Sequence, residues 1–304
     1  MSSAWPAVSY EGWRATCDTL HAHTQVLGKI AVALAPPEPQ FQHSALRVTA
    51  RGLETALLPA PDGSGGLVVA LDLRRDEAIA EHPDGGAVRV PLTPNRPVGE
   101  VTRALLTALN SLTAPVAINP TPQEVTWTVP LDEDTEHATY DPSQVASYFN
   151  AATRVALVLA EFRASFRGRS TPVNAWWGSF DLAVSLYSGR PAEPPSQDFI
   201  MRNSMDAEEI AVGWWPGDGR YPRAAFYAYA HPARPGLEDA DVSPGRWDAT
   251  LGEFVLDWDD VVEAVDPRGA ALQFCRAASR HACDVCDWDR GLAGSIAADP
   301  PPIR

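Results

Sequence analysis

Hydrophobic residues recur at three- and four-residue intervals between Tyr10 and Leu34. This spacing places them along one side of an α-helix, and Pro36-Pro37 just afterwards cannot continue a helix. The same spacing predicts three more helices, from Pro97 to about Leu109, from Ser143 to about Arg167 and from about Pro267 to Cys286. Long helices therefore stand at both ends of each half of the chain.

Short β-branched or alternating stretches lie between these helices and predict strands. They fall at 45–50, 53–58, 67–73, 78–81 and 88–92, and again at 173–177, 180–187, 209–215, 225–230 and 253–256. The order helix, β-meander, helix thus occurs twice. It predicts an α+β fold of two pseudo-repeated halves packed into one compact body. The alternative is that two α+β halves share this order by coincidence.

The domain organisation follows from these elements. We expect a first α+β half at 1–113, a connector at 114–141 that carries the motif TEHATYD, a second half at 142–290 and a flexible tail at 291–304. Residues 190–204 and 232–249 are rich in proline and polar residues, which is typical of long loops that cover sites.

The formal net charge of -15 changes the range of partners to be considered. Such a charge repels phosphate backbones and anionic membrane surfaces, so nucleic acid is not expected as a partner. The acidic clusters 132–134 and 257–260 are expected to be solvated. No stretch approaches the roughly 18 apolar residues of a membrane span, and four cysteines are too few for a disulfide scaffold. We expect a cytoplasmic protein, and the sequence predicts neither a cofactor nor an oligomeric state.

The first candidate site lies in the helix that begins at Tyr10. At 100° per residue, His21 and Gln25 share one flank of the apolar stripe with Gly28, which would leave room for a ligand or another backbone segment. Lys29 is expected to point away into solvent. The alternative for His21 is a structural histidine whose ring bonds a carbonyl.

The second candidate site is the motif TEHATYD at 135–141, which places Glu136, His137 and Tyr140 within a few residues. Acid, imidazole and phenol groups gathered in one loop suit general acid and base chemistry. The alternatives are that Asp141 starts the following helix and that Glu136 and His137 merely pair on the surface.

The third candidate site surrounds Asp181, which follows the aromatic stretch that contains Trp177 and Ser179. A carboxyl group beside large aromatic side chains is desolvated, which raises its pKa. The alternative is a core turn with a bonded Asp. Trp214 and the segment 226–229 add aromatic residues that form either plain core or a pocket wall, and Arg190 completes the candidate ligand-binding residues.

The cysteines Cys275, Cys283 and Cys286 invite comparison with a zinc site. On one helix Cys275 lies roughly 12 Å along the axis from Cys283, which is too far to share one ion. We therefore expect no metal at these cysteines, and the common phosphate-binding and hydrolase motifs are absent from the sequence.

Several motifs resemble an uncharacterised bacterial family, the domain-of-unknown-function 5996 family. They are HAHTQVLGK at 21–29, VTARGL at 48–53, TEHATYD at 135–141, WGSFDLA at 177–183, GWWPG at 213–217, AFYAYA at 225–230 and LGEF at 251–254. The resemblance spans nearly the whole chain and implies no reaction. One departure is Ala207-Glu208, where the family pattern has a His-Glu pair, which argues against a metal mechanism shared with the family.

Taken together, the residues favour a small-molecule enzyme of the hydrolase or lyase type. His21, His137, Asp181 and Glu136 are its candidate catalytic groups, and Gln25, Tyr140, Trp177, Ser179, Arg190 and Trp214 its candidate ligand-binding groups. His21, Gln25, His137 and Asp181 are expected to line one cavity. The alternatives are a binding module without turnover and a structural or interaction protein.

Overall fold

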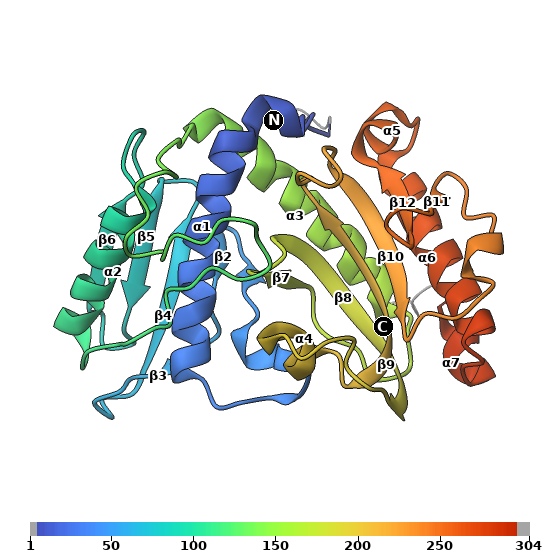
Figure 1. Ribbon diagram of the computed structural model, residues 1–304, viewed down its shortest axis with the longest axis horizontal. Coiled ribbons are helices and arrows are strands. Elements are labelled where there is room, and N and C mark those ends of the chain that lie inside the picture. The colour runs from blue at the N-terminus through green and yellow to red at the C-terminus, as the bar shows by residue number, and fades with distance from the viewer. Residues whose placement is uncertain (1–4, 297–304) are drawn as a thin grey trace, which may run out of the picture. The chain divides into compact units, whose positions relative to one another are not determined.

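The computed structural model describes residues 5–296 and confirms an α+β fold with antiparallel sheets (Figure 1). The chain divides into two units. The amino-terminal unit comprises Tyr10–Asn150 and Ala175–Phe180. The carboxy-terminal unit comprises the described residues up to Ser9, then Ala151–Asn174 and the described residues from Asp181 onward. The expected boundary near residue 142 stays a prediction, while the chain changes unit between Asn150 and Ala151 and residues 175–180 lie in the amino-terminal unit.

The amino-terminal unit contains two helices that pack on one antiparallel sheet. The helices are α1 (Tyr10–Leu34) and α2 (Val98–Leu112), and a short 3-10 helix occupies Pro39–Ser44. The strands are β1 (Arg47–Val48), β2 (Gly52–Glu54), β3 (Leu58–Pro59), β4 (Gly66–Asp72), β5 (Glu77–Glu81) and β6 (Ala87–Pro91). They are ordered β1-β2-β4-β5-β6, with β3 also paired to β4.

Helix α1 shows how the pattern of the sequence becomes structure. Its stripe residues Leu20, Leu27 and Ile30 are fully buried, which is where such a helix gains most of its stability. The helix ends at Leu34, before the two prolines, as the sequence predicted.

The carboxy-terminal unit is built around a second antiparallel sheet. Its strands are β8 (Asp181–Pro191), β9 (Ala207–Trp215), β10 (Ala225–His231), β11 (Arg246–Asp248) and β12 (Glu253–Asp257), in the order β11-β12-β10-β9-β8. Its helices are α4 (Phe199–Ser204), α5 (Trp258–Glu263), α6 (Pro267–Val285) and α7 (Arg290–Ser295), with a 3-10 turn at Leu237–Asp239. Helix α3 (Pro142–Ala164) and strand β7 (Asn174–Trp176) are the elements in which the chain passes between the units.

The two sheets do not follow the same strand order. In the amino-terminal sheet the path β1-β2-β4-β5-β6 runs in chain order with β3 off it, whereas in the other sheet β10 is bonded to β12 and β11 lies outside β12 at the edge. The shared order of helix, meander and helix is present, but the structure does not confirm the pseudo-repeat. The expected flexible tail begins within α7, which Asp289 caps through the backbone N–H groups of Gly291 and Leu292, and its remainder lies outside the described residues.

No helix in the part of the chain that the structure describes has both the length and the hydrophobicity to cross a bilayer. The acidic residues at 132–134 and 257–260 are not uniformly solvated. Asp134 is 0% exposed and Asp257 is buried, where it accepts a hydrogen bond from Tyr221. The expectation of solvated clusters was wrong for these two, because local spacing does not show which residues of a charged run face the interior.

Candidate functional site

His21 lies on α1 and faces the turn that follows β7. Its Nε2 is 3.1 Å from the carbonyl oxygen of Trp177 and 2.9 Å from that of Gly178. Two carbonyl acceptors require Nε2 to carry the proton, because a carbonyl cannot donate. The ring also stacks on Phe180 at 5.0 Å between centroids. His21 thus bonds carbonyl groups in the way that the structural alternative described.

Gln25, one turn further along α1, holds the connector in place. Its Oε1 accepts the N–H of Gln123 at 3.0 Å, and its Nε2 donates to the carbonyl of the same residue at 2.9 Å. The side chain is 0% exposed. The side-chain amide of Gln25 thus satisfies both the N–H and the C=O group of Gln123, as a neighbouring strand would do in a sheet. Gln25 therefore fixes the position of Gln123.

The space beside Gly28 is filled by an indole and not by a ligand. A Cβ atom at Gly28 would lie 2.0 Å from Cγ of Trp177. Trp177 is fully buried and its Nε1 donates to Oγ of Ser44 at 3.3 Å. Gly28 does leave room, as expected, but the space is filled by Trp177 and not by a ligand. The glycine therefore serves the packing of the amino-terminal core.

His137 forms a charge-assisted pair with Asp134. Nδ1 of His137 is 2.7 Å from Oδ2 of Asp134, while Oδ1 accepts the backbone N–H groups of Glu136 and His137 at 2.9 and 3.0 Å. Burial acts to lower the pKa of His137, but the hydrogen bond and the charge of Asp134 outweigh it and the pKa is raised. Burial likewise acts to raise the pKa of Asp134, and the bonds from His137 outweigh it and lower that pKa.

Trp127 brings the two candidate histidines of the amino-terminal unit near each other. The centroid of its ring lies 4.5 Å from that of His137 and 5.4 Å from that of His21. The carboxylate of Glu136 is exposed and adds negative charge that raises the pKa of His137. His137 therefore pairs with Asp134 and not, as one alternative had it, with Glu136.

Replacing Asp134 by asparagine is expected to lower the pKa of His137, because the asparagine oxygen can still accept the backbone N–H groups while the charge is lost. A raised histidine pKa stabilises the fold below the ordinary value of about 6.5 and loses that effect as pH rises through the folded value. The variant should lack this contribution. NMR titration of the imidazole of His137 measures the shift, with Glu136→Gln as the control for a smaller charge effect. An unchanged titration in Asp134→Asn would contradict the pairing.

Among the other predicted residues, Tyr140 and Asp141 have structural roles and Ser179 lies at the surface. Tyr140 is buried and donates to Oδ1 of Asp76 at 2.9 Å, and burial raises its pKa above the ordinary value. Asp141 accepts the N–H of Ser143 at 2.8 Å and starts α3, as its alternative described. Ser179 is exposed.

Two predicted ligand-binding residues of the carboxy-terminal unit are engaged within the fold. Trp214 is fully buried and its ring lies 5.4 Å from that of Trp258, so it belongs to the core of this unit. Arg190 donates to Glu208 at 2.5 Å and to the carbonyl of Cys286 at 2.9 Å. It thereby satisfies an acceptor at the carboxyl end of α6.

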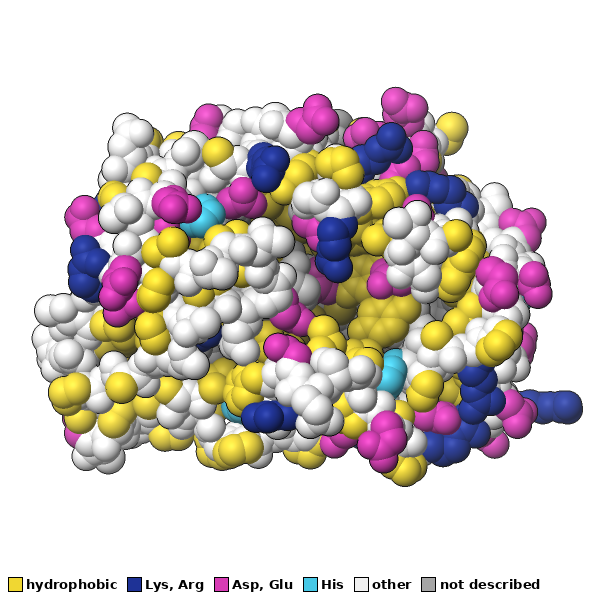
Figure 2. All heavy atoms as spheres, in the orientation of Figure 1, with side chains coloured by type: hydrophobic (Ala, Val, Ile, Leu, Met, Phe, Trp, Pro, Cys, Tyr) yellow, Lys and Arg dark blue, Asp and Glu magenta, His cyan; other side chains and the backbone are white. Residues whose placement is uncertain are grey.

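The sheet of the carboxy-terminal unit has two chemically different faces. Residues of paired strands alternate, so that Leu182, Val184, Ile210, Val212, Trp214, Phe226 and Ala228 share one face, while Ser185, Glu209, Ala211, Gly213, Tyr227 and Tyr229 share the other. The first set is wholly hydrophobic. Helix α6 packs against β9, β10 and β12. In Figure 2 hydrophobic side chains are visible over the region of β8 and β10, with acidic side chains among them.

The polar face carries a set of groups that we call the acid–tyrosine row, defined as Asp181, Ser185, Glu209, Tyr227, Tyr229 and Glu253. Tyr227 donates from its hydroxyl to Oδ2 of Asp181. Its ring lies parallel to that of Tyr229, with 6.0 Å between centroids and 7° between planes. A Cβ at Gly213 would lie 2.5 Å from the ring of Tyr227, so this glycine lets the ring rest on the sheet.

Glu209 and Glu253 have unusual proton affinities. Burial raises the pKa of Glu209 to about 7, against hydrogen bonds from Ser185 and Tyr229 that act to lower it. Burial also raises the pKa of Glu253 to about 7, and the negative charge of Asp181 acts in the same direction. Carboxyl groups with pKa values near 7 can both give and take a proton at neutral pH, which is what general acid and base chemistry needs.

Sequence reasoning named Asp181 but missed the other charged members of this row. The signal was present in the alternation of β9, where Ile210, Val212 and Trp214 fill one face and leave Glu209 on the other. A carboxylate beside Ala211 and Gly213 on the second face marks a position where large side chains from neighbouring strands can cover it.

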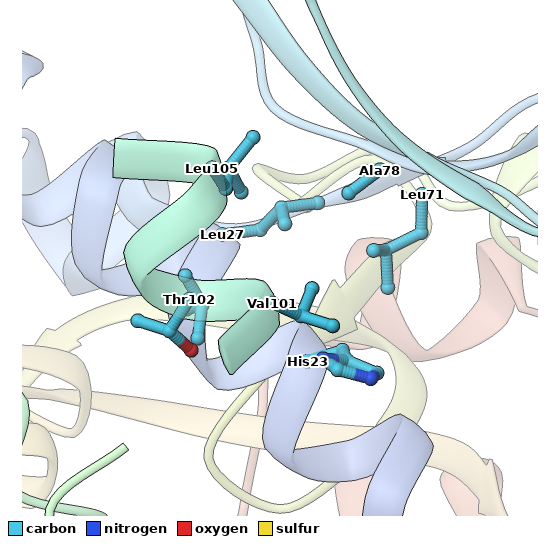
Figure 3. Close-up of a pocket in the computed structure, with 8 residues that line it drawn as sticks. His23, Leu27, Leu71, Ala78, Val101, Thr102 and Leu105 are labelled. Atoms are coloured by element: carbon cyan, nitrogen blue, oxygen red, sulfur yellow. The ribbon is translucent and has the colours of Figure 1, made fainter. Parts of the chain in front are cut away.

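One cavity in the amino-terminal unit is too small to bind a ligand. It lies between α1, α2 and the sheet, and its volume of about 10 Å³ holds one water molecule at most (Figure 3). Its lining is mainly aliphatic. Burial lowers the pKa of His23 at its wall to about 4, so this imidazole is uncharged at neutral pH.

The cysteines are thiols in buried surroundings. Cys275 and Cys283 lie in α6 and Cys286 is its carboxyl-terminal cap residue. Burial raises the pKa values of Cys275 and Cys283 to about 12, which keeps both protonated at neutral pH. Within residues 5–296, no group of three or more His, Cys, Asp and Glu side chains is placed to hold a metal ion.

No curated protein and no solved structure matches the chain. A family model described as a family of unknown function, DUF5996, matches residues 5–294. This range contains the motifs that carried the resemblance, together with α1, the His137–Asp134 pair and the acid–tyrosine row. The chain therefore belongs to the DUF5996 family.

Proposed function

We propose that the protein is an enzyme that acts on a small molecule at the acid–tyrosine row and uses Glu209 to transfer a proton. The observation that carries this proposal is the burial of Glu209, which is 5% exposed and has its pKa raised to about 7. Burying a carboxyl group costs free energy unless its partners compensate. The row stands on the sheet face opposite the wholly hydrophobic one, so packing alone does not require an acid there.

Five members of the row have distinct roles in this proposal. Glu209 is the general acid or base, and the hydroxyl groups of Ser185 and Tyr229 orient its carboxyl oxygens. Tyr227 is held by Asp181 and presents a phenol beside the parallel ring of Tyr229. Proton transfer to and from a substrate fits hydrolysis or elimination, the hydrolase and lyase classes.

The charge of the row restricts the substrate. Asp181, Glu209 and Glu253 all lie on the polar face of this sheet, in a chain whose formal net charge is -15, and the negative charge of Asp181 acts to raise the pKa of Glu253. An anionic substrate would be repelled by these acids and would favour protonation of the carboxyl group that it approaches. We therefore propose an uncharged or cationic substrate with a flat or apolar part that stacks on the tyrosine rings.

A binding module without turnover is the second candidate, supported by the parallel rings of Tyr227 and Tyr229, which suit stacking of a ligand by themselves. The joint cavity of Asp181 with His21, Gln25 and His137 stays a prediction. A cytoplasmic location also stays a proposal, supported by four buried cysteines of which none forms a disulfide within residues 5–296.

The experiment compares Glu209→Gln and Tyr227→Phe with the wild type against a panel of uncharged and cationic esters, amides and hydroxy compounds. Native mass spectrometry measures binding and proton NMR measures turnover. Glu209→Gln is expected to lower turnover at least about 100-fold, the smallest effect usual for a general acid or base. Glu208→Gln is the matched control, because Glu208 is the adjacent acid and bonds Arg190 and Ser188. Turnover that survives in Glu209→Gln would contradict the assignment, and binding without turnover would favour the binding module.

A further inference from the structure

Lys29 is the only lysine among 304 residues, and every other basic side chain of the Lys and Arg class is an arginine. The two residues differ in a way that matters for chemistry. A guanidinium does not lose its proton in proteins, whereas an ammonium group does so when it is desolvated and then becomes a nucleophile. The chain therefore has one side-chain amine, and its position in the fold decides whether that amine can react.

Lys29 is buried and not, as expected from the helical wheel, solvated. It is 4% exposed. Its Nζ donates to Oε1 of Gln123 at 3.2 Å and lies 5.2 Å from the centroid of the Trp177 ring. Within the described residues Lys29 takes part in no salt bridge. Burial lowers its pKa to about 8, with no carboxylate acting to raise it.

The surroundings of Nζ are held in place by other parts of the amino-terminal unit. Gln25 lies one helical turn before Lys29 and binds both backbone groups of Gln123. Trp177 rests on Gly28, the residue next to Lys29. The amine is thus aimed between an amide oxygen and an indole face whose positions are set by packing, which is the preorganisation that a reactive group needs.

We infer that Lys29 is a nucleophilic amine that forms an imine with a small aldehyde or ketone. The ammonium group first releases a proton to solvent. The nitrogen lone pair then attacks the carbonyl carbon, and the resulting carbinolamine loses water to leave a carbon–nitrogen double bond. The low exposure of Lys29 restricts the partner to a small carbonyl compound. This inference goes beyond the proposed function, since it concerns other residues and another unit.

The test uses the intact wild-type protein with acetaldehyde as the probe and cyanoborohydride as the hydride donor, which reduces the imine to a stable N-ethyl amine. Peptide mapping by mass spectrometry measures the initial rate at Lys29 between pH 6 and pH 10. Nα-acetyl-lysine amide in the same solution is the reference amine. The α-amino group of the chain is a second reference amine within the protein itself. A sample of folded protein with acetaldehyde but without cyanoborohydride gives the background of N-ethyl modification.

Lys29 is expected to react with a pH midpoint near 8 and, at neutral pH, at least about tenfold faster than the reference, whose amine has a pKa of about 10.4. Lys29→Arg should show labelling at the α-amino group alone. Two results would overturn the inference: Lys29 unmodified while the α-amino group is labelled, or a midpoint near that of the reference. Both are read from the wild type, so the test does not depend on whether Lys29→Arg folds.

Discussion

Replacing Trp177 by alanine is expected to lower the free energy of unfolding by about 4 kcal/mol, within the usual range for a tryptophan removed from a core. Trp177 is fully buried, and the variant loses its contacts with Gly28 and the hydrogen bond to Ser44. The indole also lies under Nζ of Lys29. Urea denaturation at fixed pH measures the loss.

Gly28→Ala sharpens this prediction through a double-mutant cycle. In the wild type the new Cβ would lie 2.0 Å from Cγ of Trp177, so the substitution should cost about 2 kcal/mol. In the Trp177→Ala background it should cost nothing, because the clashing ring is gone and alanine favours a helix over glycine by about 1 kcal/mol. Gly219→Ala is the control, since no heavy atom lies within 4 Å of a Cβ at that position. Additive effects would contradict the contact.

Glu209→Gln is expected to change how stability depends on pH. Burial raises the folded pKa of Glu209 to about 7, above the value of 4.5 for an exposed glutamate. The contribution of this group is therefore fully present below about pH 4.5 and is lost as pH rises through 7. At pH 8 the wild type must keep a buried charge, whereas the glutamine variant carries none.

We therefore expect Glu209→Gln to be more stable than the wild type at pH 8 by roughly 3 kcal/mol and to differ little at pH 5. Urea denaturation at both pH values measures the difference. Glu208→Gln should show no such gain, because Glu208 is paired with Arg190. Parallel pH profiles for the wild type and Glu209→Gln would show that the carboxyl group of Glu209 titrates normally in the fold.

Long elements could be predicted from the sequence because their signals are local. Helix α1 was predicted with its observed bounds, since a sustained apolar stripe is followed by two prolines. Helix α4 and strand β11 were missed inside segments read as loops. Both are short, and α4 depends on a cap in which Asp198 accepts the N–H of Ile200 at 2.9 Å. Elements of this size owe their stability to tertiary packing.

For the candidate sites too, features set by local sequence could be predicted and contacts between distant segments could not. Helical spacing identified His21 and Gln25 as polar groups beside the apolar stripe, but it could not show that their partners are Gln123 and the carbonyl groups near Trp177. Those contacts join residues 98 and 156 positions apart in sequence. Lys29 was placed in solvent for the same reason, because the connector that buries it is invisible to a helical wheel.

The central claim is that the acid–tyrosine row binds a small molecule, and a crystal structure of the protein with a bound compound from the panel tests it most directly. We expect the compound to stack on the rings of Tyr227 and Tyr229, with a polar atom within hydrogen-bond distance of the Glu209 carboxyl group. A compound bound elsewhere in the wild type, with the Glu209 carboxyl group still bonded to Ser185 and Tyr229, would contradict it.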